Sequence, residues 1–212
     1  MKGEYKNRNV YNMKKILLYI IAAFCTLSAF ADNAADARRV LDKAAAKINI
    51  KSGATANFTI SGGNIGKQSG TISIKGNKFC ARTSKAIMWY NGKTQWVYNK
   101  KSEEVNISSP SSAQQQTMNP YTFLSLYKSG YSMSVANTAN GQQVHLVGNK
   151  GKSVNEMYVL IDKSNTIKQV KIKQKNNWIT INIANFKATS LSDSAFSFNS
   201  KDFPKAEIVD LR

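Results

Sequence analysis

The sequence predicts a mainly β protein, an antiparallel meander of about ten or eleven short strands with one helix in front and a short helix inserted midway. Three observations predict this fold class. Apolar residues recur at helical spacing only near the start of the chain, and after Gly53 their period changes to two. Turn pairs such as Asn91-Gly92 then separate the alternating segments at regular intervals. A meander of this length is expected to roll up, burying its apolar face and hiding its edges.

The first helix is expected over residues 36–50, where apolar residues follow spacings of one, three and four. Asn33 or Asp32 is expected to cap its start, because short polar side chains accept hydrogen bonds from the first free N–H groups. The predicted apolar stripe consists of Val40, Leu41, Ala44, Ala45 and Ile48.

Alternation with a period of two predicts the strands. Between Ile87–Tyr90 and its return strand, Asn91-Gly92 predicts a type I′ turn, in which both central residues have a positive φ. The expected strands are residues 55–61, 70–75, 78–82, 87–90, 94–98, 104–107, 131–136, 142–147, 156–162, 166–174 and 178–186, and residues 196–198 and 206–211 finish the chain.

A second helix is expected at residues 119–127, after the Ser/Gln-rich loop 108–118. Asn119 is suited to cap it, and Pro120 fits the first helical position because proline has no N–H to leave unpaired. Gly130 ends it.

Residues 13–31 predict a secretory signal peptide. Two lysines precede an unbroken apolar run at residues 16–24, and Ala29 and Ala31 supply the small residues that precede a cleavage site. The run is shorter than the about 20 residues that a membrane-spanning helix needs. We therefore expect export to the periplasm and removal of residues 1–31.

Translation is expected to start at Met13, and the mature protein, a single domain over residues 32–212, is expected to start at Asp32. Cys80 is the one cysteine left after cleavage, so no intramolecular disulfide is expected and stability must come from a packed core. Cys25 lacks the small preceding residue that lipidation requires.

The chain is strongly basic. Residues 1–31 contain five of the 30 basic and one of the 12 acidic residues, so the remainder carries a formal net charge of +14. Export and the dispersion of the lysines argue against nucleic acid as a partner. Two interpretations remain open, a solvated sheet face and a field that attracts anionic lipid. The outward-facing candidates for contact with membrane surfaces are Lys168, Lys171, Lys173 and Lys175, two of which alternate with Val170 and Ile172.

Catalytic and metal-binding constellations are not indicated. His145 is the only histidine, it lies between two apolar residues of a strand, and a satisfied or solvent-facing side chain explains it. One histidine and one mature cysteine cannot supply a zinc site. The glycines at 62, 63 and 66 are followed by no helix, so they do not form a phosphate-binding loop. We expect neither an enzyme nor a cofactor or metal.

The excess of aromatic and aliphatic residues has two interpretations, an ordinary filled core and a cavity for an apolar ligand. Alternation gives the residues expected to point inward. Trp96 and Tyr98 share one face of their strand and are counted with them, although alternation does not say which face this is. The inward residues are Phe58, Ile60, Ile72, Ile74, Phe79, Val170, Ile172, Ile179, Ile181 and Ile183.

Residues 91–99, with the sequence NGKTQWVYN, resemble the hairpin (D/N)GKTxWxYN of the periplasmic outer-membrane lipoprotein carriers, the LolA family. The leading helix and the strand that starts at Gly70 fit the same pattern. Asn119-Pro120-Tyr121 opens the inserted helix where these carriers place theirs, and residues 196–199 resemble their terminal F-x-F-x-P region.

The resemblance implies a half-open antiparallel β-barrel covered by helices. Its apolar inner face would receive the acyl chains of a lipoprotein, taken from an inner-membrane exporter and delivered to an outer-membrane acceptor. The carrier would be soluble and monomeric and would use no cofactor. Residues 119–127 would act as a lid, with Phe123, Leu124 and Tyr127 facing the barrel.

One difference from the family concerns the lid. Typical carriers have Arg-Pro at the turn after the strand that starts at Gly70, and this arginine helps to hold the lid, whereas this chain has Gly76-Asn77. Two alternatives to a carrier remain open at this stage, an outer-membrane acceptor of the same fold and a periplasmic lipid-binding sensor or regulator.

Overall fold

A twelve-stranded sheet and one long helix make up the architecture seen in this computed structural model, which describes residues 33–212 apart from 64–65, 112–113, 116–126, 153 and 175. The helix spans residues 33–48. The strands are β1 (Ala54–Gly62), β2 (Gln68–Lys75), β3 (Lys78–Thr83), β4 (Ala86–Tyr90), β5 (Gln95–Asn99), β6 (Glu104–Ser108), β7 (Tyr131–Thr138), β8 (Gly141–Gly148), β9 (Glu156–Asp162), β10 (Ile167–Gln174), β11 (Asn177–Ala188) and β12 (Glu207–Asp210).

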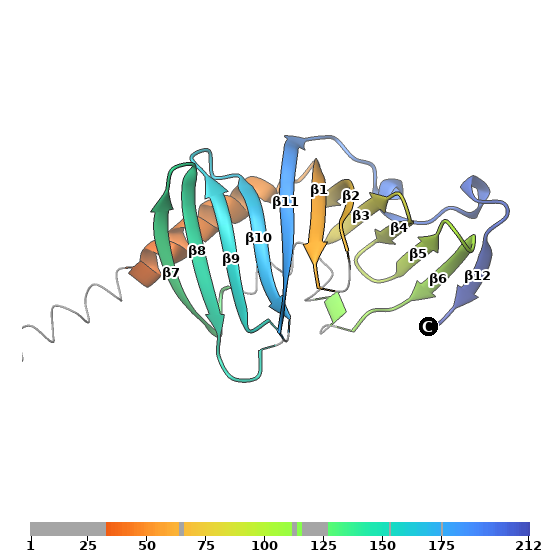
Figure 1. Ribbon diagram of the computed structural model, residues 1–212. Coiled ribbons are helices and arrows are strands. Elements are labelled where there is room, and N and C mark those ends of the chain that lie inside the picture. Colours follow the sequence, from red (N-terminus) through yellow and green to blue (C-terminus); the bar gives the residue numbers. More distant parts are fainter. Residues whose placement is uncertain (1–32, 64–65, 112–113, 116–126, 153, 175) are drawn as a thin grey trace, which may run out of the picture.

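The sheet consists of two meanders joined in the middle. Its order is β12-β6-β5-β4-β3-β2-β1-β11-β10-β9-β8-β7, so β1 and β11, far apart in sequence, form the central pair. The sheet curls, and its edge strands β7 and β12 lie at opposite ends (Figure 1). The predicted mainly β, half-open antiparallel fold is confirmed.

The strand count is twelve, one more than the upper predicted value. The additional strand, β12, pairs parallel to β6, whereas every other neighbouring pair is antiparallel. Alternation in residues 206–211 did not give this direction, because it depends on the path of the chain between β11 and β12.

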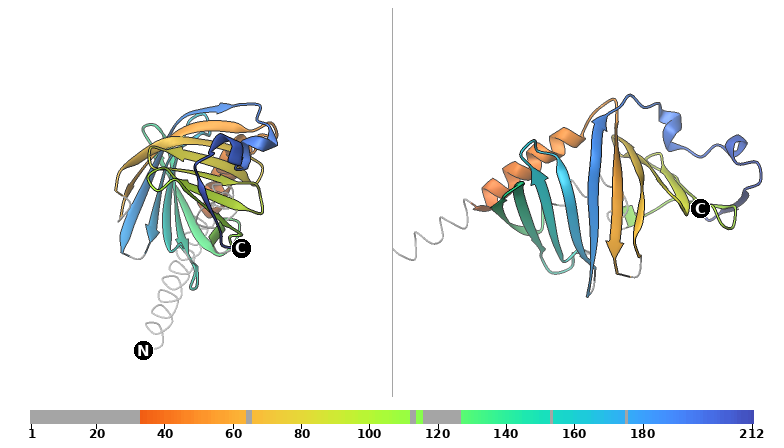
Figure 2. Two further views of the ribbon diagram at one scale, coloured as in Figure 1. Left: turned by 90° about the vertical axis from the view of Figure 1, so that its right-hand side faces the viewer. Right: turned by 45° about the horizontal axis from the view of Figure 1, so that its top comes forward.

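The helix packs on one face of the sheet, which we call the inner face; the opposite face is the outer face. Ala37, Leu41 and Ala44 are buried against inward side chains of β8, β9 and β10. The two further views show the helix running across these strands (Figure 2). Most of the predicted stripe is thus confirmed, and Ala37 extends it by one turn.

The helix ends differ from the prediction. It ends at residue 48, two residues early, before a turn at Gly53, whose φ is +112°. Asn33 lies inside the helix, and its side-chain oxygen accepts a hydrogen bond of 2.6 Å from the N–H of Val135 on β7. The Asn33 side chain therefore fastens the helix to an edge strand, while Asp32 lies outside the described residues.

The hairpin between β4 and β5 is not the predicted type I′ turn. Gly92 has a φ of +99°, but Asn91 does not have a positive φ. The Asn91 side chain accepts hydrogen bonds from the N–H groups of Lys93 and Thr94, at 3.0 and 2.8 Å. A four-residue loop held by an asparagine side chain therefore replaces the two-residue turn.

The C-terminal segment covers the outer face of β3–β5. It contains two short 3₁₀ helices, η1 (Asp193–Phe196) and η2 (Ser200–Asp202). Phe196 is fully buried against Trp89 and Cys80, and the rings of Phe198 and Phe203 lie 5.7 and 5.6 Å from that of Trp89. Residues 196–198, expected as a strand, instead leave η1 and pack on the sheet.

Candidate functional site

The inner face carries a continuous apolar surface at the centre of the sheet. Cross-strand pairing sets Phe58 of β1 opposite Ile183 of β11, and Ile60 opposite Ile181. Ile72 and Ile74 continue the surface on β2, where they pair with alanines of β1. The inward prediction made from alternation therefore agrees with the register of these strands.

Burial divides the predicted inward residues into two groups. Ile74, Phe79, Val170 and Ile179 are at most 8% exposed and belong to the packed interior. The others remain half-buried and form what we call the central strip: Phe58, Ile60, Ile72, Ile172, Ile181 and Ile183. Only the central strip combines apolar chemistry with partial exposure on the inner face.

The interior on either side of the central strip is filled by different elements. On one side, Val170 packs with the helix residues Leu41 and Ala44. On the other, Ile74, Phe79 and Tyr90 form a second cluster against which Ile48 and Ile50 pack at the end of the helix.

Gly70 explains why the Phe58 ring can lie flat across β2. A Cβ at this position would lie 2.9 Å from the Phe58 ring and 2.1 Å from the carbonyl oxygen of Arg82, both closer than real contacts allow. Phe58 and Gly70 are cross-strand partners. Glycine at the start of this strand therefore leaves room for an aromatic side chain of the central strip.

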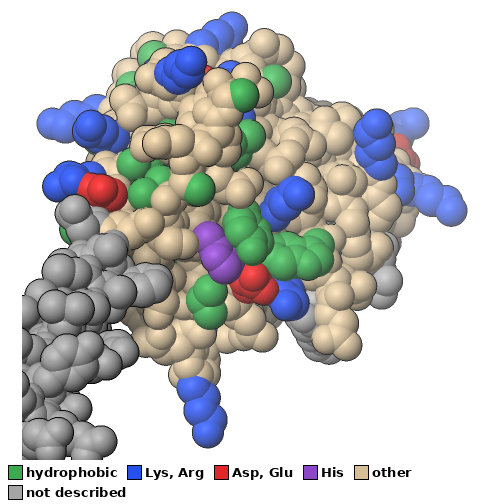
Figure 3. Space-filling model, turned by 60° about the vertical axis from the view of Figure 1, so that its left-hand side comes forward, with side chains coloured by type: hydrophobic (Ala, Val, Ile, Leu, Met, Phe, Trp, Pro, Cys, Tyr) green, Lys and Arg blue, Asp and Glu red, His purple; other side chains and the backbone are tan. Residues whose placement is uncertain are grey.

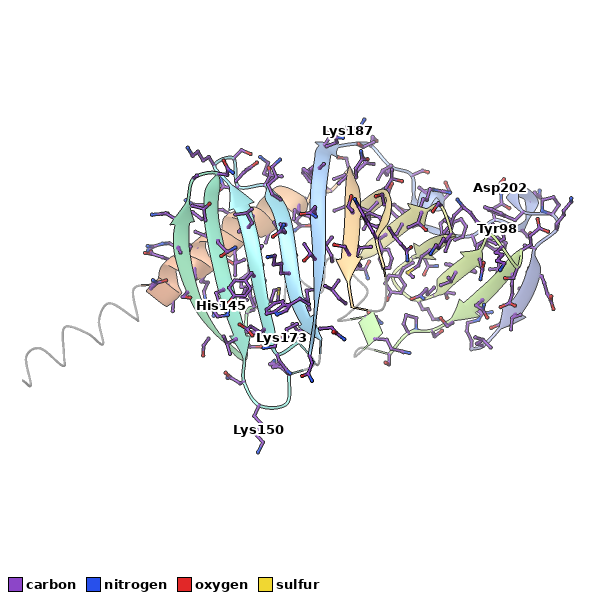
Figure 4. The ribbon with its side chains drawn as sticks, in the orientation of Figure 1. Tyr98, His145, Lys150, Lys173, Lys187 and Asp202 are labelled. Carbon is purple, nitrogen blue, oxygen red and sulfur yellow. The ribbon has the colours of Figure 1, made fainter. Side chains whose placement is uncertain are left out.

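Trp96 and Tyr98 do not line the inner face, and their place among the cavity residues is corrected. Both pack on the outer face beneath the C-terminal segment, and the rings of Tyr98 and Phe203 are 4.7 Å apart (Figure 4). The register explains this, because Trp96 pairs with Trp89, which pairs with Cys80, next to the inward Phe79.

Tyr127, a predicted lid residue, is fixed in the interior. It is 3% exposed, belongs to the helix-covered cluster, and donates a 2.5 Å hydrogen bond to Asp42 of the helix. Burial, followed by the bond to Asp42, raises the pKa of the Tyr127 hydroxyl well above its ordinary value. Phe123 and Leu124, the other two predicted lid residues, lie outside the described residues.

The Gly76-Asn77 turn, where typical carriers place the latch arginine, is flanked by lysines that contact the C-terminal segment. Lys75 donates to the carbonyl of Leu191 at 2.8 Å, and both Lys75 and Lys78 pair with Asp193. Their hydrogen bonds lower the pKa of the Asp193 carboxyl. These lysines therefore hold the outer-face cover of the sheet.

Sequence reasoning missed several inner-face residues. Met88 packs half-buried beside Tyr90, and Met133 and Val135 pack against the helix-covered cluster. The signal for Met88 was present, since the pairing of Phe79 with Tyr90 puts alternate residues of β4 on the inner face. We did not extend the alternation across that hairpin.

The single histidine has the partners of a satisfied strand residue. His145 Nε2 lies 3.0 Å from the Glu156 carboxylate, and its ring stacks on Tyr158 at 4.2 Å. In the described part of the chain, no group of three or more His, Cys, Asp or Glu side chains is placed to hold a metal ion. Burial raises the pKa of the Cys80 thiol above its ordinary value.

None of the helices among the described residues is both long and apolar enough to cross a bilayer.

A long helix on the inner face of an open, curled antiparallel sheet, with a half-buried apolar strip at its centre, defines a LolA-like fold. Residues 27–178 match the family model described as outer membrane lipoprotein carrier protein LolA. The chain belongs to this family, whose members are carriers and not enzymes. No curated protein matches the chain.

Solved structures share the fold at low sequence identity. An uncharacterized conserved protein from Thermus thermophilus is 15% identical, with a TM-score of 0.56 over 82% of this chain and 99% of that one. A LolA superfamily protein from Nitrosomonas europaea is 11% identical, with a TM-score of 0.43 over 76% of this chain and 97% of that one. LprF from Mycobacterium bovis is 10% identical, with a TM-score of 0.44 over 76% and 98% of the two chains.

Proposed function

We propose that this protein carries lipoproteins across the periplasm from the inner to the outer membrane, sheltering their acyl chains on the inner face of the sheet. Residues 1–31 would direct export and be removed, and residues 32–212 would act as one monomeric domain without a cofactor. The partners would be acylated lipoproteins, an inner-membrane exporter and an outer-membrane acceptor.

The central strip is the observation that carries this proposal. Its six side chains are aliphatic or aromatic, and each is half-buried on the face that the helix partly covers. Each CH₂ group that leaves water for such a surface gains about 0.8 kcal/mol. An apolar face therefore stabilises acyl chains by contact alone and needs no reactive group.

The direct test is capture of cargo. Inner-membrane vesicles that contain a radiolabelled acylated lipoprotein are mixed with the exporter, ATP and the purified protein, and the soluble fraction is then analysed. We expect the lipoprotein in that fraction, bound to the protein, and no capture of an unacylated version. Absence of capture by folded wild-type protein would refute the carrier function.

Paired variants on neighbouring strand positions locate the binding face. Ile72→Asp and Ile183→Asp place a charge in the central strip, and each is expected to reduce capture at least tenfold because a carboxylate would be buried against acyl chains. Thr71→Asp and Asn182→Asp put the same charge on exposed positions of the outer face and serve as controls. Thermal unfolding of all four variants checks that they fold.

A further inference from the structure

The outer face of β8–β11 carries an exposed aromatic and charged cluster, which we call the outer patch. Cross-strand pairing aligns Val147, Glu156, Lys173 and Trp178 on four adjacent strands, with His145 and Tyr158 paired beside them. Figure 3 shows hydrophobic side chains gathered around the single histidine, with an acidic and a basic side chain next to them.

Hydrogen bonds and ring contacts hold the outer patch in one arrangement. The Glu156 carboxylate accepts from Lys173 at 3.0 Å and from the Tyr158 hydroxyl at 3.3 Å, and it lies 3.0 Å from His145. The ring of Tyr158 lies between those of His145 and Trp178, at 4.2 and 5.6 Å. The patch is therefore organised before any partner binds, and little side-chain freedom remains to be lost.

The outer patch exposes apolar surface that the described structure does not cover. Val147 is 43% and Trp178 36% exposed, and these are two of the four large hydrophobic residues that are exposed among the described residues. The C-terminal segment covers the outer face of β3–β5 instead. An exposed Trp beside an exposed Val is typical of a contact surface.

The charge around the outer patch is positive. Lys171 is exposed beside Tyr158 on β10, and Lys150 projects from the β8–β9 loop at the same end of the sheet (Figure 4). The carboxylate of Glu156 offsets one of these charges, and the chain after residue 31 carries a formal net charge of +14. An anionic partner complements this excess.

We propose that the outer patch docks the protein on the anionic head-group layer of a phospholipid bilayer. Trp and Tyr side chains prefer the level of the head groups, and exposed lysines are attracted to anionic lipid. Trp178 and Val147 would enter the layer while Lys171 and Lys150 meet the phosphates. This inference rests on the proposed carrier function, which requires visits to two membranes.

Docking through the outer patch leaves the inner face free. The central strip faces the opposite side of the same strands, so an acyl chain bound there would not block contact with the bilayer. We therefore expect empty and loaded protein to dock with similar affinity.

Of the four lysines that the sequence suggested for membrane contact, two are engaged in ion pairs. Lys168 lies 3.5 Å from Asp162, and Lys173 lies 3.0 Å from Glu156. Lys175 lies outside the described residues. Lys171 is therefore the best single position to change, because its reversal breaks no ion pair within the outer patch.

Co-sedimentation of the exported protein with vesicles tests the inference. Vesicles of phosphatidylcholine mixed with phosphatidylglycerol are compared with vesicles of phosphatidylcholine alone, across a salt series. We expect binding only to the anionic vesicles, weakening as salt screens the exposed charges. The double variant Trp178→Ala with Lys171→Glu should bind at least tenfold less, because each lysine charge contributes about fivefold.

A matched control uses the same changes away from the outer patch. Lys187→Glu reverses a charge at the far end of β11 (Figure 4), and Ile208→Ala removes an exposed apolar side chain from β12; together they should leave vesicle binding within about twofold of wild type. Circular dichroism and thermal unfolding are recorded for both double variants, whose changed residues are exposed.

The outcomes separate this inference from the proposed function. If the protein captures lipoprotein but does not sediment with anionic vesicles, the docking inference is wrong and the carrier function stands. Binding that is independent of salt, equal on both kinds of vesicle, or unchanged in the outer-patch variant also overturns it. If the protein docks but captures no acylated lipoprotein, the carrier function fails instead.

Discussion

Asp162 shows how one side chain closes a turn of the sheet. Between β9 and β10 its carboxylate accepts hydrogen bonds from the N–H groups of Ser164 and Thr166, both at 2.9 Å, and from the Ser164 hydroxyl at 2.7 Å. Partial burial alone would raise the pKa of Asp162, but these bonds outweigh it and lower the pKa to about 2. The ionised form therefore stabilises the turn.

The low pKa of Asp162 predicts a loss of stability in acid. The contribution is complete above the unfolded-state pKa near 4 and disappears as the pH falls to about 2, which amounts to about 2 kcal/mol. Asp162→Asn should be less stable at pH 7 and should flatten this part of the profile. Urea unfolding of both proteins from pH 7 to pH 2 measures it, and identical pH slopes would contradict the assignment.

At the residue scale, alternation identified which side chains share a face but not always which face they occupy. For Phe58, Ile72 and Ile183 the apolar side had to be the buried side, so their orientation followed. Trp96 and Tyr98 lie on a segment that is apolar on both sides, because the C-terminal segment covers its outer face. The sequence of the strand alone does not contain that information.

The helix is tied to the chain after the predicted lid by the bond between Tyr127 and Asp42. Tyr127→Phe keeps the packing and removes the bond, so we expect a loss of about 1 kcal/mol in the free energy of unfolding. A double-mutant cycle with Asp42→Ala should give a coupling energy of similar size. Strictly additive effects would show that the bond contributes nothing.

The C-terminal segment is predicted to be part of the core rather than a loose tail. Phe196 is fully buried on the outer face, so Phe196→Ala should lower the free energy of unfolding by about 3 kcal/mol through lost burial and a cavity. Leu211→Ala, at a residue 63% exposed, is the control and should change it by less than about 0.5 kcal/mol. Equal effects in chemical denaturation would contradict this role.

At the element scale, the eleven antiparallel strands were predictable because each alternates and is bounded by turn residues. The hairpin at Asn91-Gly92 was predicted at the right place with the wrong geometry, since the asparagine side chain caps a wider loop. Residues 189–206 have no regular period, so neither their path over the sheet nor the parallel pairing of β12 could be predicted.

On the scale of the whole molecule, the two faces of the sheet are covered at different ends. The helix covers the inner face over β8–β10, and the C-terminal segment covers the outer face over β3–β5. This leaves the central strip half-buried on one side and the outer patch exposed on the other. One sheet thus offers a place for acyl chains and a separate place for a membrane.

The candidate site was predictable as a surface rather than as a cavity. Register and alternation located the central strip, whereas its extent of exposure depends on where the helix ends and on how far the sheet curls. Both are properties of the assembled fold, set by packing between elements distant in sequence.

Site-specific photo-cross-linking tests the central claim most directly. A photoreactive residue is placed at Ile72 or Ile183 in the central strip, or at the neighbouring outer-face positions Thr71 or Asn182, and the protein is loaded with a lipoprotein whose acyl chains carry a mass label. We predict adducts to the acyl chains from Ile72 and Ile183 and none from Thr71 and Asn182. Acyl adducts of equal yield from both faces, or from the outer positions alone, would contradict a carrier that shelters its cargo on the inner face.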